Sequence, residues 1–405
     1  MVLNVIIIAV TLALAGYLAF SKRLEKSEGW AATVTPLASI MGSGFLISAP
    51  LLAGVVGNLA LICMAILLAL AYAVGSAIRF NIRHFEPIEN DGHGAAQDIA
   101  FLSRVVLSAA YFITVTYYIK LLAAFLLNAL PFTSGDEVAA NSVATVILGV
   151  IGGVGMWRGL DKLEKVETFA VSLNLGMIGA LLVALAAHNI GLLAGGDWHL
   201  PDVSSDISQH DLRVLLGLLI VVQGFETSRY LGDEHPAELR IRTMRAAQLI
   251  SAAIYLVFIG LATVLFHGGL DADVTAIVNM TRPVAVVLPL LLTIAAIGSQ
   301  FSAAVADDLG AGGLLEDITH HKLPVRYAYL LILLVTVSLV WATNVNSIIA
   351  YASRAFALFY LLQCLVALMV AWEKRDLPHR SLRIGAFGLI GFFCFLVFAF
   401  GLPAE

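Results

Sequence analysis

The stretch SIMGSGFLISAP (39–50) places two glycines and a proline inside an apolar run that extends from residue 31 to residue 56. A second stretch, VVQGFETSRYLGDEH (221–235), interrupts another apolar run with glycine and charged residues. A helix break in lipid leaves backbone groups without partners, so it is tolerated only where protein or water surrounds it. The two stretches together predict a cavity inside a membrane-spanning fold.

The composition indicates a polytopic membrane protein. Hydrophobic residues make up 60% of the chain and charged residues 13%, and the mean hydropathy is +0.93. The net charge of −5 is small, and no basic patch points to a nucleic-acid partner. Cys63, Cys364 and Cys394 lie in apolar runs without metal-binding spacing, so we expect small core residues and no metal site.

Apolar runs long enough to cross a hydrocarbon core of ~30 Å predict an all-α fold of about twelve transmembrane helices in a lipid bilayer. The runs lie at residues 3–20, 31–56, 58–80, 99–129, 141–157, 165–188, 211–232, 243–266, 284–310, 325–343, 346–372 and 383–402.

Basic residues predict the orientation of these spans. Residues 1–5 carry no lysine or arginine, and no small-residue cleavage site follows the apolar stretch. We therefore expect the run 3–20 to be a true span and not a signal peptide. Lys22, Arg23 and Lys26 share one side of the predicted membrane with most of the 23 basic residues, and that side is expected to be cytoplasmic. The prediction is a multi-pass protein of the cell (inner) membrane with both termini extracytoplasmic.

The spacing of the two breaks predicts an inverted repeat. Gly44 and Gly224 are 180 residues apart, and five spans run from the first break to the second. An odd number of spans turns the second copy upside down, as in transporters whose paired broken helices meet near the bilayer midplane. The predicted units are an extra helix and cytoplasmic loop (1–30), a first repeat of core helices 1–5 (31–190), a second repeat of core helices 6–10 (191–372), and a cytoplasmic loop with a C-terminal helix (373–405).

Several motifs resemble those of the amino acid-polyamine-organocation (APC) superfamily of permeases. GSGF (42–45) with its following proline and LALAYAVG (68–75) resemble core helices 1 and 2, and GFETSRYLGDEHPAELRIRTMRAAQLIS (224–251) resembles core helix 6 and its following loop. The resemblance covers residues 31–372 and implies a leucine-transporter-like fold of five plus five helices.

Departures from the family pattern place the chain in an outlying subfamily. Gln223 lies where the permeases often have an aromatic gate, and Asn174 replaces a common lysine. Asp307 and Asp308 stand where a serine-arginine pair is common. A familiar substrate is therefore not assumed.

The resemblance implies secondary transport of an amino acid or a related small organic solute by alternating access, and no enzymatic activity. It assigns the substrate carboxylate to the backbone of core helix 1, at Gly42, Ser43 and Gly44. It assigns the amino group and the gate to core helix 6, at Gly224, Phe225 and Glu226, with Gln223 beside them. Glycine permits close backbone approach, and a helix N-terminus stabilises an anion. The alternative is that these glycines only permit close helix packing.

Two basic residues inside predicted spans are further substrate-site candidates, because charge at this depth is costly. Lys120 lies in core helix 3 and Arg354 in core helix 10. They would form an electropositive vestibule that attracts an anionic substrate. Alternatively, one of them pairs with Glu226 or extends to the membrane surface.

Coupling to an ion is left open between protons, sodium and uncoupled exchange. Glu226 would carry a proton, or would instead accept hydrogen bonds from helix-end amides. Ser299 and Ser302 share a helix face, and with backbone carbonyls near Ala38 and Met41 they offer the oxygen ligands that hard cations prefer.

An inner gate is predicted from charges about two turns inward of the helix centres. Its members are Arg229, Asp307 and Asp308, which would otherwise form a purely structural ion pair.

The loop 81–95 contains His84, Glu86, Glu89, Asp91 and His93, whose spacing matches no zinc motif. A solvated loop beside the gate is the favoured interpretation. A membrane sensor that binds a solute and signals through a partner is the alternative function, and a membrane enzyme lacks a nucleophile matched to the loop histidines. The sequence leaves the oligomeric state open.

Overall fold

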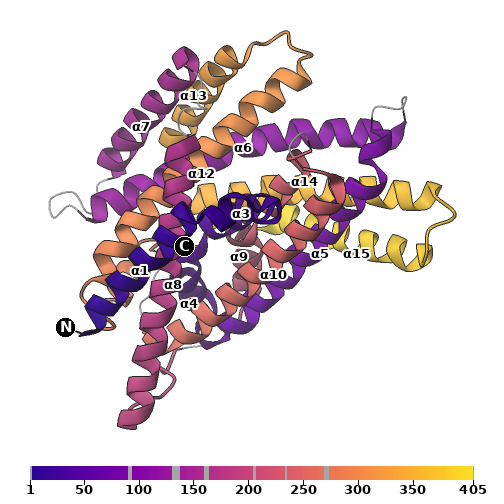
Figure 1. Ribbon diagram of the computed structural model, residues 1–405. Helices are drawn as coiled ribbons and strands as arrows, with labels where there is room; N and C mark the ends of the chain where they lie inside the picture. Colours follow the sequence, from indigo (N-terminus) through magenta and orange to yellow (C-terminus); the bar gives the residue numbers. More distant parts are fainter. Residues whose placement is uncertain are drawn as a thin grey trace.

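The computed structural model describes residues 2–89, 94–129, 137–158, 164–203, 207–232, 235–268 and 273–404, without the side chains of Ser43, Arg158 and residues 164–169. Within these ranges the regular structure is helical throughout (Figure 1). The helices, with 3₁₀ segments marked η, are α1 (Val2–Phe20), α2 (Lys22–Glu25), α3 (Glu28–Ser43), α4 (Phe45–Val56), η1 (Gly57–Leu59), α5 (Ala60–His84), η2 (Glu86–Ile88), α6 (Ala95–Asn128), α7 (Glu137–Arg158), α8 (Glu164–Gly195), α9 (Gln209–Gly217), η4 (Leu219–Val222), η5 (Phe225–Tyr230), α10 (Ala237–Ala262), η6 (Thr263–Leu265), α11 (Ala276–Met280), α12 (Leu288–Ile318), α13 (Val325–Ala342), α14 (Val345–Glu373) and α15 (Arg380–Phe400).

The spans of the described chain agree with the predicted number. Ten segments are long and apolar enough to cross a membrane, and one of them, Glu28–His84, has 57 residues. A single crossing needs about 20 residues, so this segment makes two crossings, one through α3 and α4 and the next through α5. The interrupted segment from α9 to η5 adds one more, which gives the twelve helices that the sequence predicts.

The two predicted breaks are present, and their residues explain them. Core helix 1 divides into α3 and α4 at Gly44. Core helix 6 leaves α-helical geometry after Gly217 and continues as η4 and η5 around Gln223 and Gly224. Gly224 has φ of +118°, which side chains with a Cβ rarely adopt. Because 3₁₀ helices are short and less stable than α-helices, core helix 6 depends on its neighbours for its shape.

Two groups of helices make up the core. The first, called the broken-helix group, consists of α3, α4, α5, the segment α9–η5 and α10, which contact one another. The second, called the scaffold group, consists of α6, α7, α12 and α13, with α14 packed on α6. In Figure 1, α7 and α13 lie side by side beyond α6 and α12.

Helices in equivalent positions of the two repeats pack together. The contacts pair α5 with α10, α6 with α12, α7 with α13, and α3 with η4 and η5. The fold is therefore the predicted inverted repeat of five plus five helices, and α1 and α15 are the extra helices. The exact repeat boundaries at residues 31, 190 and 372 stay a prediction.

The extra helices are attached to the core by close contacts. Helix α1 packs on α8, where a Cβ added to Gly176 would lie 2.7 Å from the Ala15 nitrogen. Helix α15 packs on α14, and the residues after it reach α9, the first part of core helix 6, where the Leu402 N–H donates to the Arg213 carbonyl at 2.9 Å.

Candidate functional site

The two helix breaks cross each other with their backbones in contact. A Cβ on Gly44 would lie 2.5 Å from the Val221 Cα, and one on Gly224 would lie 2.7 Å from the Ile40 nitrogen. Each glycine therefore permits the other broken helix to approach. The hydroxyl of Tyr255, from α10, lies within hydrogen-bond reach of the Ile40 carbonyl at 3.1 Å and of the Val221 carbonyl. One tyrosine hydroxyl thus contacts a backbone carbonyl from each of the two breaks.

A polar group from α12 occupies the break of core helix 1. The Gly42 carbonyl accepts hydrogen bonds from the Ser299 hydroxyl at 3.2 Å and from the Gln300 amide at 3.1 Å. Asn174, from α8, donates to the Ser299 oxygen at 3.4 Å. The freed carbonyl of the break therefore connects core helices 1, 5 and 8 at the place where a coupling ion is predicted.

Glu226 is buried at the break of core helix 6, with 1% of its surface exposed. Its Oε2 accepts hydrogen bonds from the Gly224 N–H at 3.0 Å and from the Tyr360 hydroxyl at 2.8 Å. The Tyr360 ring stacks on Phe225 with 5.3 Å between centroids. The contact with a helix-end amide is the acceptor role considered for Glu226, and its role as a proton carrier stays a prediction.

Buried carboxylates, hydroxyls and amides occur in both helix groups, and a hydrogen bond joins the groups. Thr114 of α6 donates to Asp307 of α12, and Gln223 donates to the Tyr118 hydroxyl at 3.0 Å. Asp308 is 3% exposed. Neither Glu226 nor Asp308 takes part in any of the ion pairs found among the described residues. Buried carboxylates without a cationic partner are costly, so this region has the electrostatics of a site for a proton or a positively charged group.

Comparison with known proteins identifies the family. A family model described as an APC superfamily transporter matches residues 22–401. This chain belongs to the APC superfamily of transporters. An uncharacterized protein of Aquifex aeolicus (strain VF5) is 42% identical over 369 residues, which cover 89% of each chain.

A solved structure supports the same fold. The crystal structure of the Eremococcus coleocola manganese transporter, in complex with an aromatic bis-isothiourea substituted compound, matches with a TM-score of 0.60 and 13% identity. The match covers 90% of this chain and 84% of that chain. At this identity it shows the fold alone, which confirms the leucine-transporter-like class.

The two basic candidates of this APC transporter are bound to protein oxygens. Lys120 is 4% exposed and donates to the Asn141 side chain at 2.9 Å, to the Val340 carbonyl at 2.8 Å and to the Thr343 carbonyl. Arg354 donates to the Phe398 carbonyl of α15 at 2.7 Å. Both side chains hold neighbouring helices, and their place in an anion vestibule stays a prediction.

Arg229, the cation of the predicted inner gate, bonds in the structure to residues other than the two predicted aspartates. Arg229 donates to Gln363 and forms an ion pair with Glu89 at 3.4 Å, whereas Asp307 accepts from Thr114. Glu86 pairs in turn with Arg240 at 2.6 Å. The segment 81–95, predicted as a loop, is instead helical through His84 at the end of α5 and again over Glu86–Ile88 in η2. The ion pairs of Glu86 and Glu89 also make it more than a solvated segment. No group of three or more potential ligands suited to a metal occurs in the described ranges, which do not include Asp91 and His93.

The remaining predicted residues of the transporter fall near the crossing. Met41 and Ser302 are buried, Ala38 is half-buried one turn before Gly42, and the side chain of Ser43 lies outside the described residues. Sequence reasoning missed Tyr360, Tyr255 and Gln300. The available signal was that each places a polar atom inside a long apolar span, where such atoms mark pathways or helix contacts.

Proposed function

We propose that this APC transporter is a secondary active carrier of an amino acid or a related small organic solute, which it binds where core helices 1 and 6 break. The observation that carries the proposal is the backbone crossing of Gly44 and Gly224 beside the buried carboxylate of Glu226. Freed backbone groups and one buried charge are the elements with which discontinuous helices bind a polar solute at the midplane. Membership of a transporter superfamily supports the same activity.

The solute is proposed to carry an amino group. Glu226 offers a carboxylate, and the stacked rings of Phe225 and Tyr360 offer aromatic faces, to which a cationic group is attracted. The amides around Gly42, Ser43 and Gly44 would receive a carboxylate. An anionic solute drawn by Lys120 and Arg354 is less well supported, because both side chains already donate to protein oxygens.

Protons are proposed as the coupling ion, with Glu226 as the carrier. Glu226 is buried without a cationic partner in the described ranges, so neutralisation by a proton or by the amino group stabilises it. The oxygen group at Gly42 is the sodium alternative. It carries no formal charge, and the Gly42 carbonyl already accepts two hydrogen bonds.

The membrane placement is proposed from charge. The multi-pass arrangement follows from the helices and the family. We place the protein in the cell (inner) membrane, and the distribution of basic residues among the loops supports an orientation with both termini extracytoplasmic. One-sided labelling of a cysteine placed near each terminus tests this topology.

Binding and uptake by the reconstituted protein test the proposed function. A thermal-shift screen of amino acids, amines and organic acids identifies the candidate solute, because a ligand that binds the folded state raises Tm. The labelled hit should then accumulate in proteoliposomes with saturable kinetics, and Glu226→Ala should remove the accumulation. A hit that shifts Tm without any uptake would favour the solute sensor. Uptake that is unchanged in Glu226→Ala would overturn the proposed site.

A further inference from the structure

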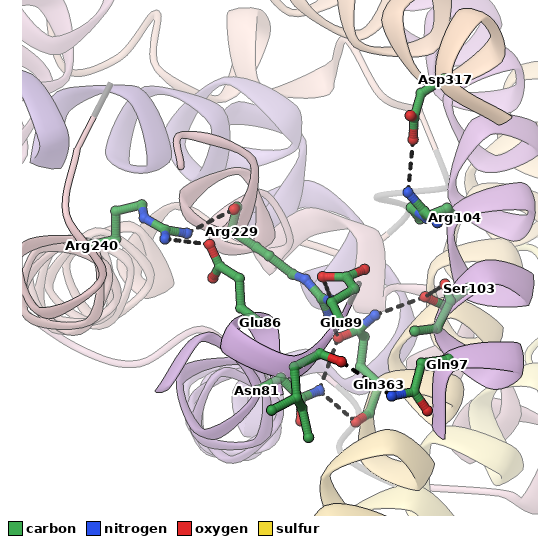
Figure 2. Close-up of polar contacts among 12 residues, drawn as sticks. Asn81, Glu86, Glu89, Gln97, Ser103, Arg104, Arg229, Arg240, Asp317 and Gln363 are labelled. Atoms are coloured by element: carbon green, nitrogen blue, oxygen red, sulfur yellow. Dashed lines mark hydrogen bonds and ion pairs between the residues drawn. The ribbon is translucent and has the colours of Figure 1, made fainter. Parts of the chain in front are cut away.

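The short connection after core helix 2, residues 85–89, is bound to the end of core helix 6 (Figure 2). Glu86 Oε1 accepts from Arg240 at 2.6 Å and Glu89 Oε2 accepts from Arg229 at 3.4 Å. The Arg229 guanidinium also lies over the Phe85 ring, 5.8 Å from its centroid. Both arginines are at least nine-tenths buried, whereas the two glutamates are half-buried. The connection thus closes over two buried cations.

Arg240 fixes the inner half of core helix 6. Its Nη1 donates to the Arg229 carbonyl at 2.8 Å, its Nε to the His235 carbonyl at 3.0 Å, and its Nη2 to Glu86. One guanidinium therefore holds the last turn of η5, the segment leading into α10 and the connection 85–89. Arg229 lies three residues after Glu226, which is one turn of a 3₁₀ helix. A movement of this arginine pair would move the turn that carries Glu226.

A fully buried amide joins the two helix groups at the same end. The Gln363 side chain, from α14, accepts from Asn81 of α5 at 3.0 Å and from Arg229 of η5, and it donates to Ser103 of α6 at 2.9 Å. Asn81 and Arg229 belong to the broken-helix group, whereas Ser103 and Gln363 belong to the scaffold group or pack on it. Relative motion of the two groups, as alternating access requires, separates these hydrogen-bonded partners.

We propose that Glu86, Glu89, Arg229, Arg240 and Gln363 form an inner latch, which holds η5 against α14 and shields Glu226 from the membrane face that bears the basic loops. The latch must release before a solute leaves the site toward that face. This role rests on the proposed transport function. The opening of the latch itself is measurable without any solute.

A matched control pair exists on the same two helices. Arg83 of α5 binds Glu238 of α10 with two bonds, at 2.9 and 2.6 Å, and their side chains are 49% and 71% exposed. This pair does not contact η5 through any bond found in the described residues. Exposed ion pairs contribute little to stability, so Glu238→Gln removes an ion pair between α5 and α10 without affecting the latch.

Cysteine accessibility tests the latch. Ser228 is 0% exposed and lies between Glu226 and Arg229 in η5, and Ser228→Cys adds a thiol of similar size. A membrane-impermeant thiol reagent is applied to each side of oriented membranes. The double substitution Glu86→Gln and Glu89→Gln is introduced into the Ser228→Cys protein. We expect it to increase the rate at which the thiol at residue 228 is labelled from the basic-loop side about tenfold, which lies within the range typical of coupling between two states. Glu238→Gln should leave the rate unchanged.

Two further measurements separate latch release from unfolding and from the transport proposal. The parent cysteines Cys63, Cys364 and Cys394 are buried, so unfolding would increase their labelling in the variant without Ser228→Cys. Arg240→Lys keeps the charge but cannot make all three bonds, and it should increase labelling at residue 228 as well. Equal labelling with the latch intact or disrupted, or an increase only from the opposite side, would overturn the latch. Absent uptake together with the expected labelling would overturn the transport proposal alone.

Discussion

At the scale of single residues, the crossing of the two breaks depends on two glycines for different reasons. Gly44 has φ of −158°, which any residue can adopt, so only the contact with Val221 requires glycine there. Gly224 requires it both for its positive φ and for the contact with Ile40. Beside Gly44 the Val221 Cα and Cβ lie nearest, and beside Gly224 the Ile40 nitrogen lies close together with the Ser39 side chain. The backbone and Cβ atoms among these cannot move aside as the end of a long side chain would.

Alanine at either glycine tests the crossing. Gly224→Ala should destabilise the protein more than Gly44→Ala, because a non-glycine residue at positive φ adds about 1–3 kcal/mol of strain. Both variants should lose uptake, measured in proteoliposomes, and both should show a lower Tm. Gly153, on α7, has open space around its Cβ position, so Gly153→Ala should keep uptake and Tm. Normal uptake in both test variants would refute the crossing as the site.

Tyr360 tests the environment of Glu226 at the same scale. Tyr360→Phe keeps the ring stacked on Phe225 but removes a hydrogen bond to the Glu226 carboxylate. Hydrogen bonds to charged groups contribute about 1.5–3 kcal/mol, so we expect uptake efficiency to fall by roughly 10-fold or more. Tyr351, exposed on the same helix, provides the control Tyr351→Phe. Equal kinetics for the two variants would show that Tyr360 does not act on the site.

At the scale of elements, core helix 6 is held separately on each side of its break. Ser353 of α14 accepts from the Ile220 N–H at 2.9 Å and donates to the Gly217 carbonyl at 2.6 Å, which satisfies two backbone groups freed where α9 ends. Arg240 likewise donates a hydrogen bond to the Arg229 carbonyl near the end of η5. The sequence predicted both breaks, because glycine and charge in an apolar run are local signals. It did not predict Ser353 as a partner, because that residue lies 133 positions away in another span.

Ser353→Ala tests this support of the break. The change removes one hydrogen bond to a buried N–H and one to a buried carbonyl, and a hydrogen bond typically contributes about 0.5–1.5 kcal/mol. We therefore expect a clearly lower Tm in detergent, measured by thermal unfolding. Ser338, at an exposed position of α13, donates to the Leu334 carbonyl of its own helix, so Ser338→Ala should have little effect. A Tm loss of the same size in both variants would contradict a specific role for Ser353.

At the scale of the whole molecule, hydropathy and the inverted spacing of the breaks predicted the spans and the repeat plan, and the family resemblance supplied the leucine-transporter-like class. The number of spans and the repeat plan depend on patterns within each span, whereas the extra terminal helices follow from the part of the chain that the resemblance covers. The ion pairs that close one end could not be predicted in this way, because Glu89 and Arg229 are 140 residues apart and Glu86 and Arg240 are 154 apart. In the sequence the two glutamates resemble a solvated loop, and only the packing of α5 against η5 and α10 brings them to their partners.

The coupling ion is a property of the whole molecule, because it links binding at the crossing to the movement of the two helix groups. We expect an imposed pH gradient to drive uptake by the parent protein. Glu226→Gln should abolish this effect of the gradient, because the glutamine amide is always uncharged and cannot bind and release a proton. Glu226 is buried and has no cationic partner among the described residues. Ser299→Ala should leave the proton drive intact, because it alters only the oxygen group at Gly42. Proteoliposomes with opposed pH and sodium gradients measure both effects with one labelled solute. Uptake that follows the sodium gradient and is lost in Ser299→Ala would contradict proton coupling. It would assign coupling to the oxygens of Gly42, Ser299 and Gln300. Of these, Gln300 Oε1 has no hydrogen-bond partner within the described chain, so it is available to a cation.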